Sequence, residues 1–428
     1  MRKQAKFELK QVLKFKENLL HWANQDEYCV FLDGNLQKDT YTTADSIVGI
    51  GAFTALKVKE GNAFKQLEEY QKSSNDWLFG YFSYDLKNEI ENLQSNNQDE
   101  VNFPNLYFVQ PVKVIELKGN TVIFHYLTSV EEEMESDFRV ISDYQIPAHQ
   151  PSKPIQLTPR ITRSGYIESV KKTLAHIARG DIYEANFCMD FYASNVVLNP
   201  LHTYRKLNAI SSPPQAAYLK FEHYSALCAS PERYLKHHQQ KLISQPIKGT
   251  AKRGQTKKED LALKKALEND PKEKSENIMI VDLVRNDLSK TAQKASVKVE
   301  ELCKVYSFKQ VHQLISTVTS QPKTTFSPVS LIQSTFPMGS MTGAPKVSAM
   351  QLMEKLESFR RGLYSGSIGY FTPNGNFDFN VVIRSILYNS ANQNISYAVG
   401  SAITSASTPE KEYQECLIKA KAMKEVLS

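Results

Sequence analysis

The alternation of helical segments with short β-branched runs after about Ile161 is the feature that most restricts the fold of this chain. Amphipathic segments span 164–180 and 409–427, and runs such as VVIRSILY and ISYAVGSAIT lie between them. The segment PNGN at 373–376 is a short connection of the kind that joins the two strands of a hairpin. The pattern predicts an α+β fold with largely antiparallel sheets and helices packed outside them.

A proline-rich segment divides the chain into two regions. Residues 1–150 contain apolar and aromatic runs (YCVFLDGN, SIVGIGAFTALKV and DWLFGYFSYDL) that are broken by Gly and Asn, as short strands are. The segment IPAHQPSKPIQLTPR, at 146–160, carries four prolines and is the predicted linker. We therefore assign 1–150 to an N-terminal region and 155–428 to a second region, which contains the chemically informative motifs.

The composition excludes several classes of protein. Of the 428 residues, 41% are hydrophobic and 23% are charged, and the net charge of +6 is too small and too dispersed for a nucleic-acid-binding surface. No apolar run approaches the roughly 18 residues that a membrane span requires. The five cysteines form no C-x-x-C pair and the basic N-terminus lacks the composition of a transit peptide, so we expect a cytoplasmic protein. The glycine-rich motifs of dinucleotide and P-loop sites are missing.

The first chemical motif combines an acid with a lysine. Glu232 lies in SPER, and Lys248 lies sixteen residues later in PIKGT, directly before a Gly–Thr turn. A lysine that acts as a nucleophile or base must be partly neutral, which requires burial or nearby cations to lower its pKa. Glu232 would be a matching proton donor if its surroundings raise its pKa. A surface lysine in an exposed ion pair is the alternative that the local spacing leaves open.

Two acidic couples share one spacing and one context. Each couple follows a proline in the first turns of a predicted helix, and the couples are Glu273 with Glu276 and Glu412 with Glu415. The i, i+3 spacing puts both carboxylates of a couple on one helix face. Two such helices that converge would form an all-oxygen site suited to Mg²⁺ and an anionic substrate. Acidic residues also favour helix N-termini because of the macrodipole, which leaves a structural role open.

Two further motifs suit anionic groups. The loop FPMGSMTGAPK, at 336–346, leads into a predicted helix whose first N–H groups can hold a carboxylate or phosphate. Arg384 lies in the apolar run VVIRS, where a buried guanidinium needs a partner. A ligand carboxylate could be that partner, and a protein carboxylate such as Asp282 or Asp378 is the alternative. Asp282 and Arg285 are otherwise predicted to serve packing and ion pairing.

Taken in order, these motifs resemble those of the chorismate-utilising enzyme family. The resemblance covers 164–428 and rests on GDIYEANF, SPER, PIKGT, KEKSENIMIVDLVRNDL, FPMGSMTGAPK, RRGLYSGSIGYF, VVIRS and PEKEYQE. The N-terminal region matches loosely, at VFLDGN and GYFSYDL. The family implies an anthranilate synthase component I-like fold, in which two antiparallel β-sheets form an interleaved core with helices outside. It also assigns 155–428 to chorismate binding and catalysis.

The resemblance implies a transferase reaction in folate and 4-aminobenzoate biosynthesis. Chorismate and ammonia would give 4-amino-4-deoxychorismate, with Mg²⁺ as cofactor. Lys248 would attack C2 of chorismate, Glu232 would protonate the departing C4 hydroxyl, and ammonia would then add at C4 and expel the lysine. A separate glutaminase subunit would supply the ammonia, and a lyase would act on the product.

The same resemblance implies roles for the remaining candidates. The implied substrate contacts are Gly249, Thr250, Thr342, Tyr364, Arg384, Gly400 and Ala402. The implied Mg²⁺ ligands are Glu276 and Glu415 directly, and Glu273 and Glu412 through water.

Single positions decide between members of the family. Anthranilate synthases, the main alternative, carry Ala where Lys248 stands, and their L-L-E-S feedback segment is not found here. Isochorismate and salicylate synthases use a lysine base where this chain has Glu184, and a non-catalytic relative that binds chorismate or a glutaminase is a third possibility. The chain departs from the family at Glu184, usually Gln in amine-adding members, at Gln313, often His, and at Ser401, which interrupts glycines. The neighbouring His312 is predicted to point away from the site.

Overall fold

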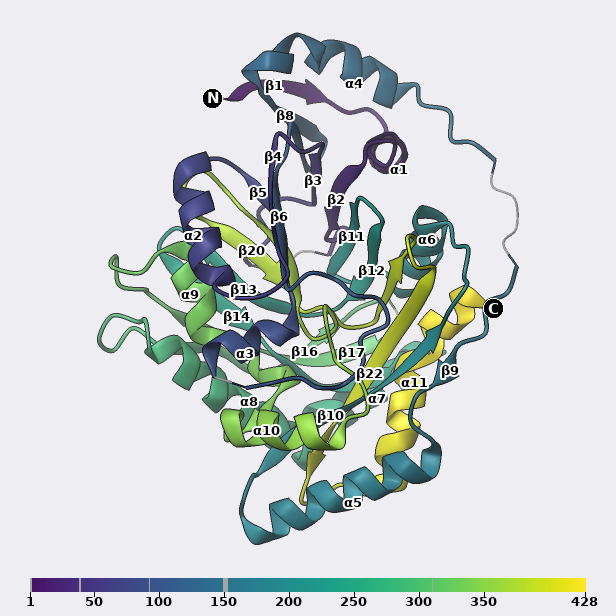
Figure 1. Cartoon of the computed structure of the whole chain (residues 1–428), viewed down its shortest axis with the longest axis vertical. Coiled ribbons are helices and arrows are strands. Elements are labelled where there is room, and N and C mark those ends of the chain that lie inside the picture. The colour runs from purple at the N-terminus through teal and green to yellow at the C-terminus, as the bar shows by residue number, and fades with distance from the viewer. Residues whose placement is uncertain (1, 38–39, 92, 149–152, 310) are drawn as a thin grey trace.

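Two antiparallel β-sheets that share an apolar core form the body of the molecule (Figure 1). The computed structural model describes residues 2–37, 40–91, 93–148, 153–309 and 311–428. Within these residues the larger sheet has 12 strands and the smaller has 10. All the strand pairs of both sheets are antiparallel. The predicted α+β fold with two antiparallel sheets is therefore confirmed.

The larger sheet begins with strands of the N-terminal region and ends beside the 336–346 loop. Its spatial order is β1 (Arg2–Glu8), β8 (Thr121–Leu127), β7 (Lys113–Lys118), β3 (Ser46–Ile50), β2 (Tyr28–Asp33), β11 (Gln215–Phe221), β12 (Tyr224–Ser230), β21 (Ser385–Asn389), β22 (Asn394–Thr404), β10 (Glu184–Ala193) and β18 (Gly343–Ala344). The short strand β9 (Thr158–Pro159) also pairs with β10.

The smaller sheet carries the PIKGT motif at one end. Its spatial order is β15 (Ile247–Lys252), β17 (Val311–Ser320), β14 (Lys241–Gln245), β13 (Arg233–His238), β20 (Phe377–Asn380), β19 (Ser367–Phe371), β5 (Leu78–Phe82), β6 (Leu106–Gln110) and β4 (Thr54–Val58). Strand β16 (Lys298–Ser307) pairs with β17. The PNGN segment connects β19 to β20 as the predicted hairpin turn.

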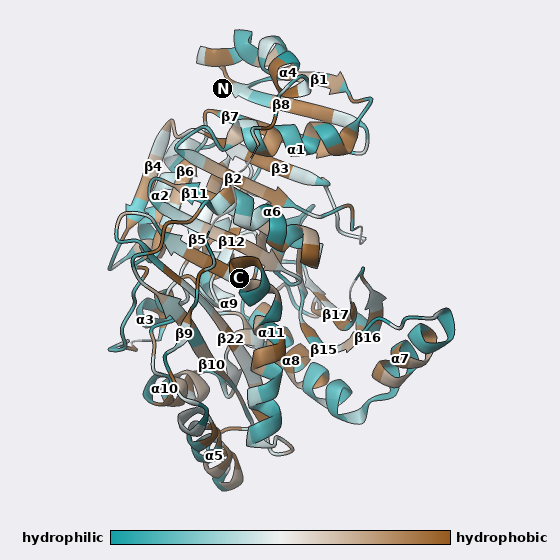
Figure 2. Ribbon diagram, turned by 90° about the vertical axis from the view of Figure 1, so that its right-hand side faces the viewer, coloured by the Kyte–Doolittle hydropathy of each residue, from teal (hydrophilic) through white to brown (hydrophobic). Residues whose placement is uncertain are grey.

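Helices lie around the sheets and cover their outer faces (Figure 1). They are α1 (Val12–Ala23), α2 (Ala63–Ser74), α3 (Lys87–Ile90), α4 (Met134–Ser142), α5 (Arg163–Arg179), α6 (Pro200–Ser211), α7 (Lys257–Asn269), α8 (Pro271–Ser289), α9 (Pro328–Thr335), α10 (Lys346–Leu356) and α11 (Pro409–Leu427). Three short 3₁₀ turns complete the list: η1 (Tyr84–Leu86), η2 (Thr128–Glu133) and η3 (Gly339–Met341). Helix α7 is mostly hydrophilic (Figure 2) and of its residues Leu267 is buried.

Strand alternation separates two apolar cores. In β2, Val30 belongs to a core shared by strands of both sheets, whereas its neighbours Cys29 and Phe31 belong to a core between the larger sheet and its helices. Successive strand residues point to opposite faces of a sheet, so a strand covered on both faces is apolar throughout. Buried aromatic rings such as Phe82 and Phe379, 5.3 Å apart, fill the first core.

Both sequence regions contribute to both sheets. In the larger sheet β2 pairs with β11, and in the smaller sheet β5 pairs with β19. The division near residue 150 is therefore a division of the sequence, and each core contains residues from both sides of it. The predicted linker at 146–160 lies partly outside the described residues, and its described end includes β9.

No helix in the described part of the chain is both long and apolar enough to cross a bilayer. All five cysteines are free thiols, four of them buried, as their scattered positions predict.

Candidate active site

Lys248 lies at an irregular point of β15, next to α8. The register between β15 and β17 shifts between Ile247 and Thr250, and Gly249 at the shift has a φ of +93°. A Cβ at position 249 would lie 3.0 Å from Leu314 Cδ1 and 3.1 Å from Glu273 Oε2, so this close approach requires glycine. The motif therefore places the lysine beside the N-terminal turns of α8.

The ammonium of Lys248 is nearly buried and forms an ion pair. Its side chain is 11% exposed, and Nζ donates a hydrogen bond of 2.8 Å to Oε1 of Glu184, the first residue of β10. This contact crosses between the two sheets, because β10 belongs to the larger sheet and β15 to the smaller. The alternative of an exposed surface lysine is therefore wrong.

The electrostatics of Lys248 correct one expectation. Burial lowers the pKa of Lys248, as the sequence argument requires, but Glu184, Glu276 and Glu232 together outweigh burial and raise it above its usual value. The lysine is therefore an ammonium in this structure, and the predicted lowering of its pKa is wrong. Glu184, which the sequence marks only as a departure from the family, supplies the largest part of the opposing field.

Glu232 has the environment of a proton donor. It lies between β12 and β13 with 4% of its surface exposed, and its N–H donates 3.2 Å to Ser230 Oγ. Burial raises the pKa of Glu232 to about 7. A carboxyl group with a pKa near neutrality holds a proton that it can release during a reaction at pH 7. The condition that the sequence argument sets for Glu232 is met.

The two acidic couples converge on one lysine. In α8 the side chain of Asp270 caps the N–H groups of Lys272 and Glu273, and in α11 Pro409 occupies the first turn. Lys272 Nζ lies 3.7 Å from Glu276 Oε1 and 3.8 Å from Glu412 Oε1. Burial lowers the pKa of Lys272, but the negative charges of the two acidic couples outweigh burial and raise it. The four carboxylates that act on Lys272 are Glu276, Glu412, Glu273 and Glu415. The structure therefore brings all four glutamates around one positive charge.

The individual carboxylates differ in their partners. Glu276 Oε1 is buried and accepts no hydrogen bond, and burial raises the pKa of Glu276 to about 7. Burial also raises the pKa of Glu273. Glu415 lies 2.6 Å from Lys419 Nζ, which holds its pKa below the usual value despite burial. Glu412 accepts a hydrogen bond from Ser401.

The glutamate cluster has the chemistry of a cation site without the geometry of a complete one. In the described ranges no group of three or more acidic, His or Cys side chains is spaced as ligands of one metal ion. Two observations nevertheless favour a cation here: Glu276 keeps a buried oxygen without a hydrogen-bond partner, and the Lys272 ammonium lies where a cation would neutralise Glu276 and Glu412. Carboxylates suit Mg²⁺, which binds through one or two of them together with water and an anionic substrate.

Helix α8 is fixed beside Lys248 by a buried amide that the sequence argument missed. Asn277 Nδ2 donates 3.2 Å to Leu314 O of β17 and 3.4 Å to Lys248 O, and Ser316 Oγ donates 2.5 Å to Asn277 Oδ1. The residue directly follows Glu276. Its contacts therefore set the distance between the glutamates of α8 and the lysine of β15.

Arg384 has neither of the protein partners that the sequence suggests. Asp378 pairs with Arg233 and Lys236, and Asp282 pairs with Arg285 on the surface, as predicted for the latter two. No carboxylate of the described residues lies within 4.0 Å of the Arg384 guanidinium, and burial lowers its pKa. Arg384 is also outside a strand: it has a φ of +54° in the bend that precedes β21. Arg384 is half-buried, and a cation without an ion-pair partner can accept a ligand carboxylate.

Three other predicted substrate contacts, Tyr364, Gly400 and Ala402, lie in the segment before β19 and in β22. Tyr364 is 4% exposed, and burial raises its pKa well above the usual value. Gly400 and Ala402 lie in β22, which pairs with β10 along one edge. Along its other edge β22 pairs with β21 only at residues 394–397, so in the described chain no strand pairs with that edge at Gly400 and Ala402. Lys419 Nζ donates 2.8 Å to Gly400 O.

The structure gives two candidates a less direct role. The Thr342 hydroxyl donates to Met338 O and Gly339 O within its own loop, at 3.4 and 3.1 Å, so it stabilises η3. Thr250 is exposed and pairs with Gln313 through the backbone. His312 points away from the site, as predicted, with Nε2 3.0 Å from Asp260.

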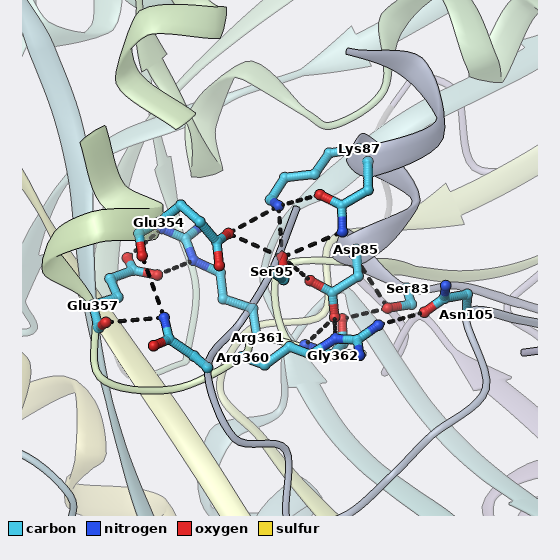
Figure 3. Close-up of polar contacts among 12 residues, drawn as sticks. Ser83, Asp85, Lys87, Ser95, Asn105, Glu354, Glu357, Arg360, Arg361 and Gly362 are labelled. Atoms are coloured by element: carbon cyan, nitrogen blue, oxygen red, sulfur yellow. Dashed lines mark hydrogen bonds and ion pairs between the residues drawn. The ribbon is translucent and has the colours of Figure 1, made fainter. Parts of the chain in front are cut away.

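A buried charge network fixes the segment between α10 and Tyr364 (Figure 3). Arg361, 2% exposed at its side chain, donates 2.9 Å to Glu357 Oε2 from Nε, 2.7 Å to Met341 O and 2.8 Å to Asn186 O. One guanidinium therefore joins the 336–346 loop to β10, at residues that lie two positions from Gly343 and two positions from Glu184 in the sequence. These contacts hold the 336–346 loop and β10 in one arrangement.

The same network ties this segment to the N-terminal region. Arg360 Nε donates 2.7 Å to Asp85, and Lys87 Nζ lies 3.0 Å from Glu354 and 2.9 Å from Ser95 Oγ (Figure 3). Lys87 is 1% exposed. The N-terminal region is thus part of the scaffold of the site, although the informative motifs lie outside it.

Comparison with known proteins identifies the family. A family model for chorismate binding enzymes matches residues 25–425. "Aminodeoxychorismate synthase component 1" of Bacillus subtilis is 32% identical over 360 residues, which cover 81% of this chain and 76% of that protein. "Anthranilate synthase component 1" of Aquifex aeolicus is 32% identical over 364 residues, which cover 81% of this chain and 73% of that protein.

A solved structure gives the same result for the fold. The crystal structure of anthranilate synthase component I from Streptococcus pneumoniae superposes with a TM-score of 0.78 at 24% identity, over 91% of this chain and 95% of that one. The predicted anthranilate synthase component I-like fold is therefore confirmed. The chain spans 50%, 49% and 41% of three longer curated relatives, each called an aminodeoxychorismate synthase. Because the family model covers nearly all of its length, the chain belongs to the chorismate-binding enzyme family.

Proposed function

We propose that this chain converts chorismate and ammonia to 4-amino-4-deoxychorismate. The observation that carries the proposal is the nearly buried Lys248, whose field reaches the protonated acid Glu232 and the glutamates of α8 and α11. Anthranilate synthases have Ala at this position, so a lysine in the site favours a reaction that needs a second nucleophile. Relatives named aminodeoxychorismate synthase support the same choice.

The reaction is a double displacement. The neutral amine of Lys248 forms a bond to C2 of chorismate while the C4–O bond breaks, and Glu232 gives its proton to the departing hydroxyl, which leaves as water. Ammonia then bonds to C4, the C2–nitrogen bond breaks, and its electron pair returns to the lysine. The new C4 ammonium loses a proton to the Glu232 carboxylate, which restores the acid.

Arg384 and the polar groups near it would hold the substrate. Arg384 has no protein carboxylate and would pair with the enolpyruvyl carboxylate, with Tyr364 beside it. The N–H groups of Gly400 and Ala402 would donate to the same group, and Gly249, Thr250 and Thr342 would shape the rest of the pocket. Glu184, Glu232 and Glu276 are buried, and in this proposal they keep water from the reacting carbons.

Mg²⁺ is the proposed cofactor. We assign Glu276 and Glu415 as its direct ligands and Glu273 and Glu412 as ligands through water. The ion would neutralise the ring carboxylate of chorismate and orient the ring. The side chain of Lys272 moves away from Glu276 and Glu412 in this assignment, because it lies where the charge of the ion is needed.

A glutaminase subunit is the proposed source of ammonia, and a lyase is the proposed consumer of the product on the route to 4-aminobenzoate and folate. The proposed location is the cytoplasm, where the five thiols would stay reduced.

A product assay tests the proposal. The purified chain is incubated with chorismate, Mg²⁺ and ammonium, with and without added lyase, and the products are separated. We expect an aminated chorismate that becomes 4-aminobenzoate only when the lyase is present. Anthranilate without lyase would identify an anthranilate synthase, the alternative that relatives of equal identity favour. No consumption of chorismate at high ammonium would identify a non-catalytic relative.

A further inference from the structure

Glu184 lies on a strand that is paired along both of its edges at this residue. It is the first residue of β10, where its backbone pairs with Ala344 of β18 on one side and Thr404 of β22 on the other. Its side chain is 1% exposed. A carboxylate on a strand between two paired neighbours keeps its position, so its contact with Lys248 is built into the sheet.

The two oxygens of Glu184 have different surroundings. Oε1 accepts the 2.8 Å hydrogen bond from Lys248 Nζ, whereas Oε2 is buried and has no hydrogen-bond partner among the described residues. Within the same ranges, Glu184 is the only carboxylate within 4.0 Å of the lysine nitrogen. The fields of other carboxylates also reach Lys248 from α8, α11 and the turn before β13; these are Glu273, Glu276, Glu415 and Glu232.

The contact raises a chemical problem for the nucleophile. An ammonium has no lone pair, so Lys248 must lose a proton before it can form a bond to carbon. Glu232 must keep its own proton for the departing hydroxyl, and it does not lie within 4.0 Å of the Lys248 nitrogen in this structure. The acceptor in contact is Glu184 Oε1. In a site removed from water, both charges of the pair lose their solvation, which brings the neutral amine and carboxylic acid closer in free energy to the ion pair.

We propose that Glu184 is the proton partner of Lys248: Oε1 takes one proton from the ammonium before the attack on C2 and returns it when ammonia expels the lysine. This inference rests on the proposed function. The proton balance closes within one turnover, because Lys248 starts as an ammonium, departs from C2 as a neutral amine and is reprotonated by the Glu184 acid.

The Glu184→Gln variant tests the proposal, because the amide keeps the shape and an oxygen acceptor for the lysine but cannot take a proton. The enzyme is mixed with chorismate and Mg²⁺ without ammonium, quenched after short times, and the mass of the intact chain is measured. We expect wild type to gain the mass of chorismate minus water. At pH 7 the variant should form this adduct about 10²-fold more slowly, within the range for general acid–base catalysis.

The pH dependence provides a readout that a structural role would not change. In Glu184→Gln the rate of adduct formation should rise with pH as solvent deprotonates the lysine, whereas the wild-type rate should show no such rising limb. Glu184→Asp keeps a carboxylate and should lack the rising limb even if it is slow. Glu410→Gln, which removes an exposed ion pair with Arg163, is the matched control and should behave as wild type.

The outcomes separate this inference from the proposed function. Wild-type rate and pH profile in a folded Glu184→Gln variant would overturn the role of Glu184 and leave the reaction intact. Absence of both adduct and aminated product in wild type would overturn the proposed function, and the role of Glu184 with it.

Discussion

Replacing Arg384 with glutamine should weaken substrate binding without weakening the fold. Its guanidinium is half-buried and has no carboxylate partner within 4.0 Å in the described chain, so the variant removes a charge that no ion pair of the ligand-free protein compensates. Arg361 provides the contrast, because its guanidinium is fully engaged with Glu357 and with two backbone carbonyls. The two substitutions are chemically identical and differ only in what the protein supplies around the charge.

The expected magnitudes follow from these surroundings. A hydrogen bond to a charged group contributes about 1.5–3 kcal/mol, so Arg384→Gln should raise the Kd for chorismate by roughly 10-fold to 150-fold, at about 1.4 kcal/mol per tenfold. The free energy of unfolding should stay the same or rise, because a desolvated and unpaired charge is removed. Arg361→Gln leaves Glu357 buried without its cation and should lose about 3–5 kcal/mol of stability.

The assay combines thermal unfolding of the ligand-free proteins with calorimetric titration of chorismate in the presence of Mg²⁺. We expect Arg384→Gln to unfold at the wild-type temperature or above it and Arg361→Gln to unfold well below. If Arg384→Gln is as unstable as Arg361→Gln and binds chorismate with wild-type affinity, then Arg384 is a structural residue and its role as a substrate anchor is wrong.

Three further predictions concern the acid, the glutamate cluster and the bend beside Lys248. The wild-type kcat should fall as the pH rises through about 7, where Glu232 loses its proton, and Glu232→Gln should lack this limb and lower kcat by about 10²-fold to 10⁴-fold in a pH-rate profile. Lys272→Ala should raise the affinity for Mg²⁺ about tenfold in a calorimetric titration without chorismate, because it removes the ammonium that competes for Glu276; unchanged affinity would contradict the cation site. Gly249→Ala should destabilise the protein by about 1–2 kcal/mol in urea unfolding, because alanine is strained at a φ of +93°; wild-type stability would contradict the argument from close approach.

Local sequence patterns predict the parts of the site that one element determines. The prolines and the i, i+3 spacing give the helix starts of α8 and α11, and both couples of glutamates lie where that spacing puts them. The burial and raised pKa of Glu232 also follow the expectation for an acid. The helix starts and the glutamate spacing depend on contacts between residues a few positions apart, which the periodicity of a helix already encodes, whereas the pKa of Glu232 depends on burial by distant segments.

Contacts between strands that are distant in the sequence are the features of the fold and the site that could not be predicted from the sequence. Alternation tells which face of a strand is buried but not which strand lies opposite, so neither the β2–β11 pairing nor the contact of Lys248 with Glu184, 64 positions earlier, can be read from it. The error in the predicted pKa of Lys248 has this origin. The local motif reveals burial, which lowers the pKa, while the carboxylate that raises it arrives from the other sheet.

The charged side chains with a structural role differ from the candidate site residues in whether the protein satisfies their hydrogen bonds and ion pairs. Lys346 is buried but donates to Asp287 and to the carbonyls of Thr335 and Pro337, which satisfies all three of its donors. By contrast, Arg384 has no ion pair in the described chain, and Glu276 and Glu184 each keep a buried oxygen without a hydrogen-bond partner among the described residues. A buried group without a partner costs about 1–3 kcal/mol, and a ligand that completes these contacts recovers that cost. Mg²⁺ and chorismate together should therefore stabilise the protein more than the sum of each alone, whereas ligands that leave any of these groups unpaired should not.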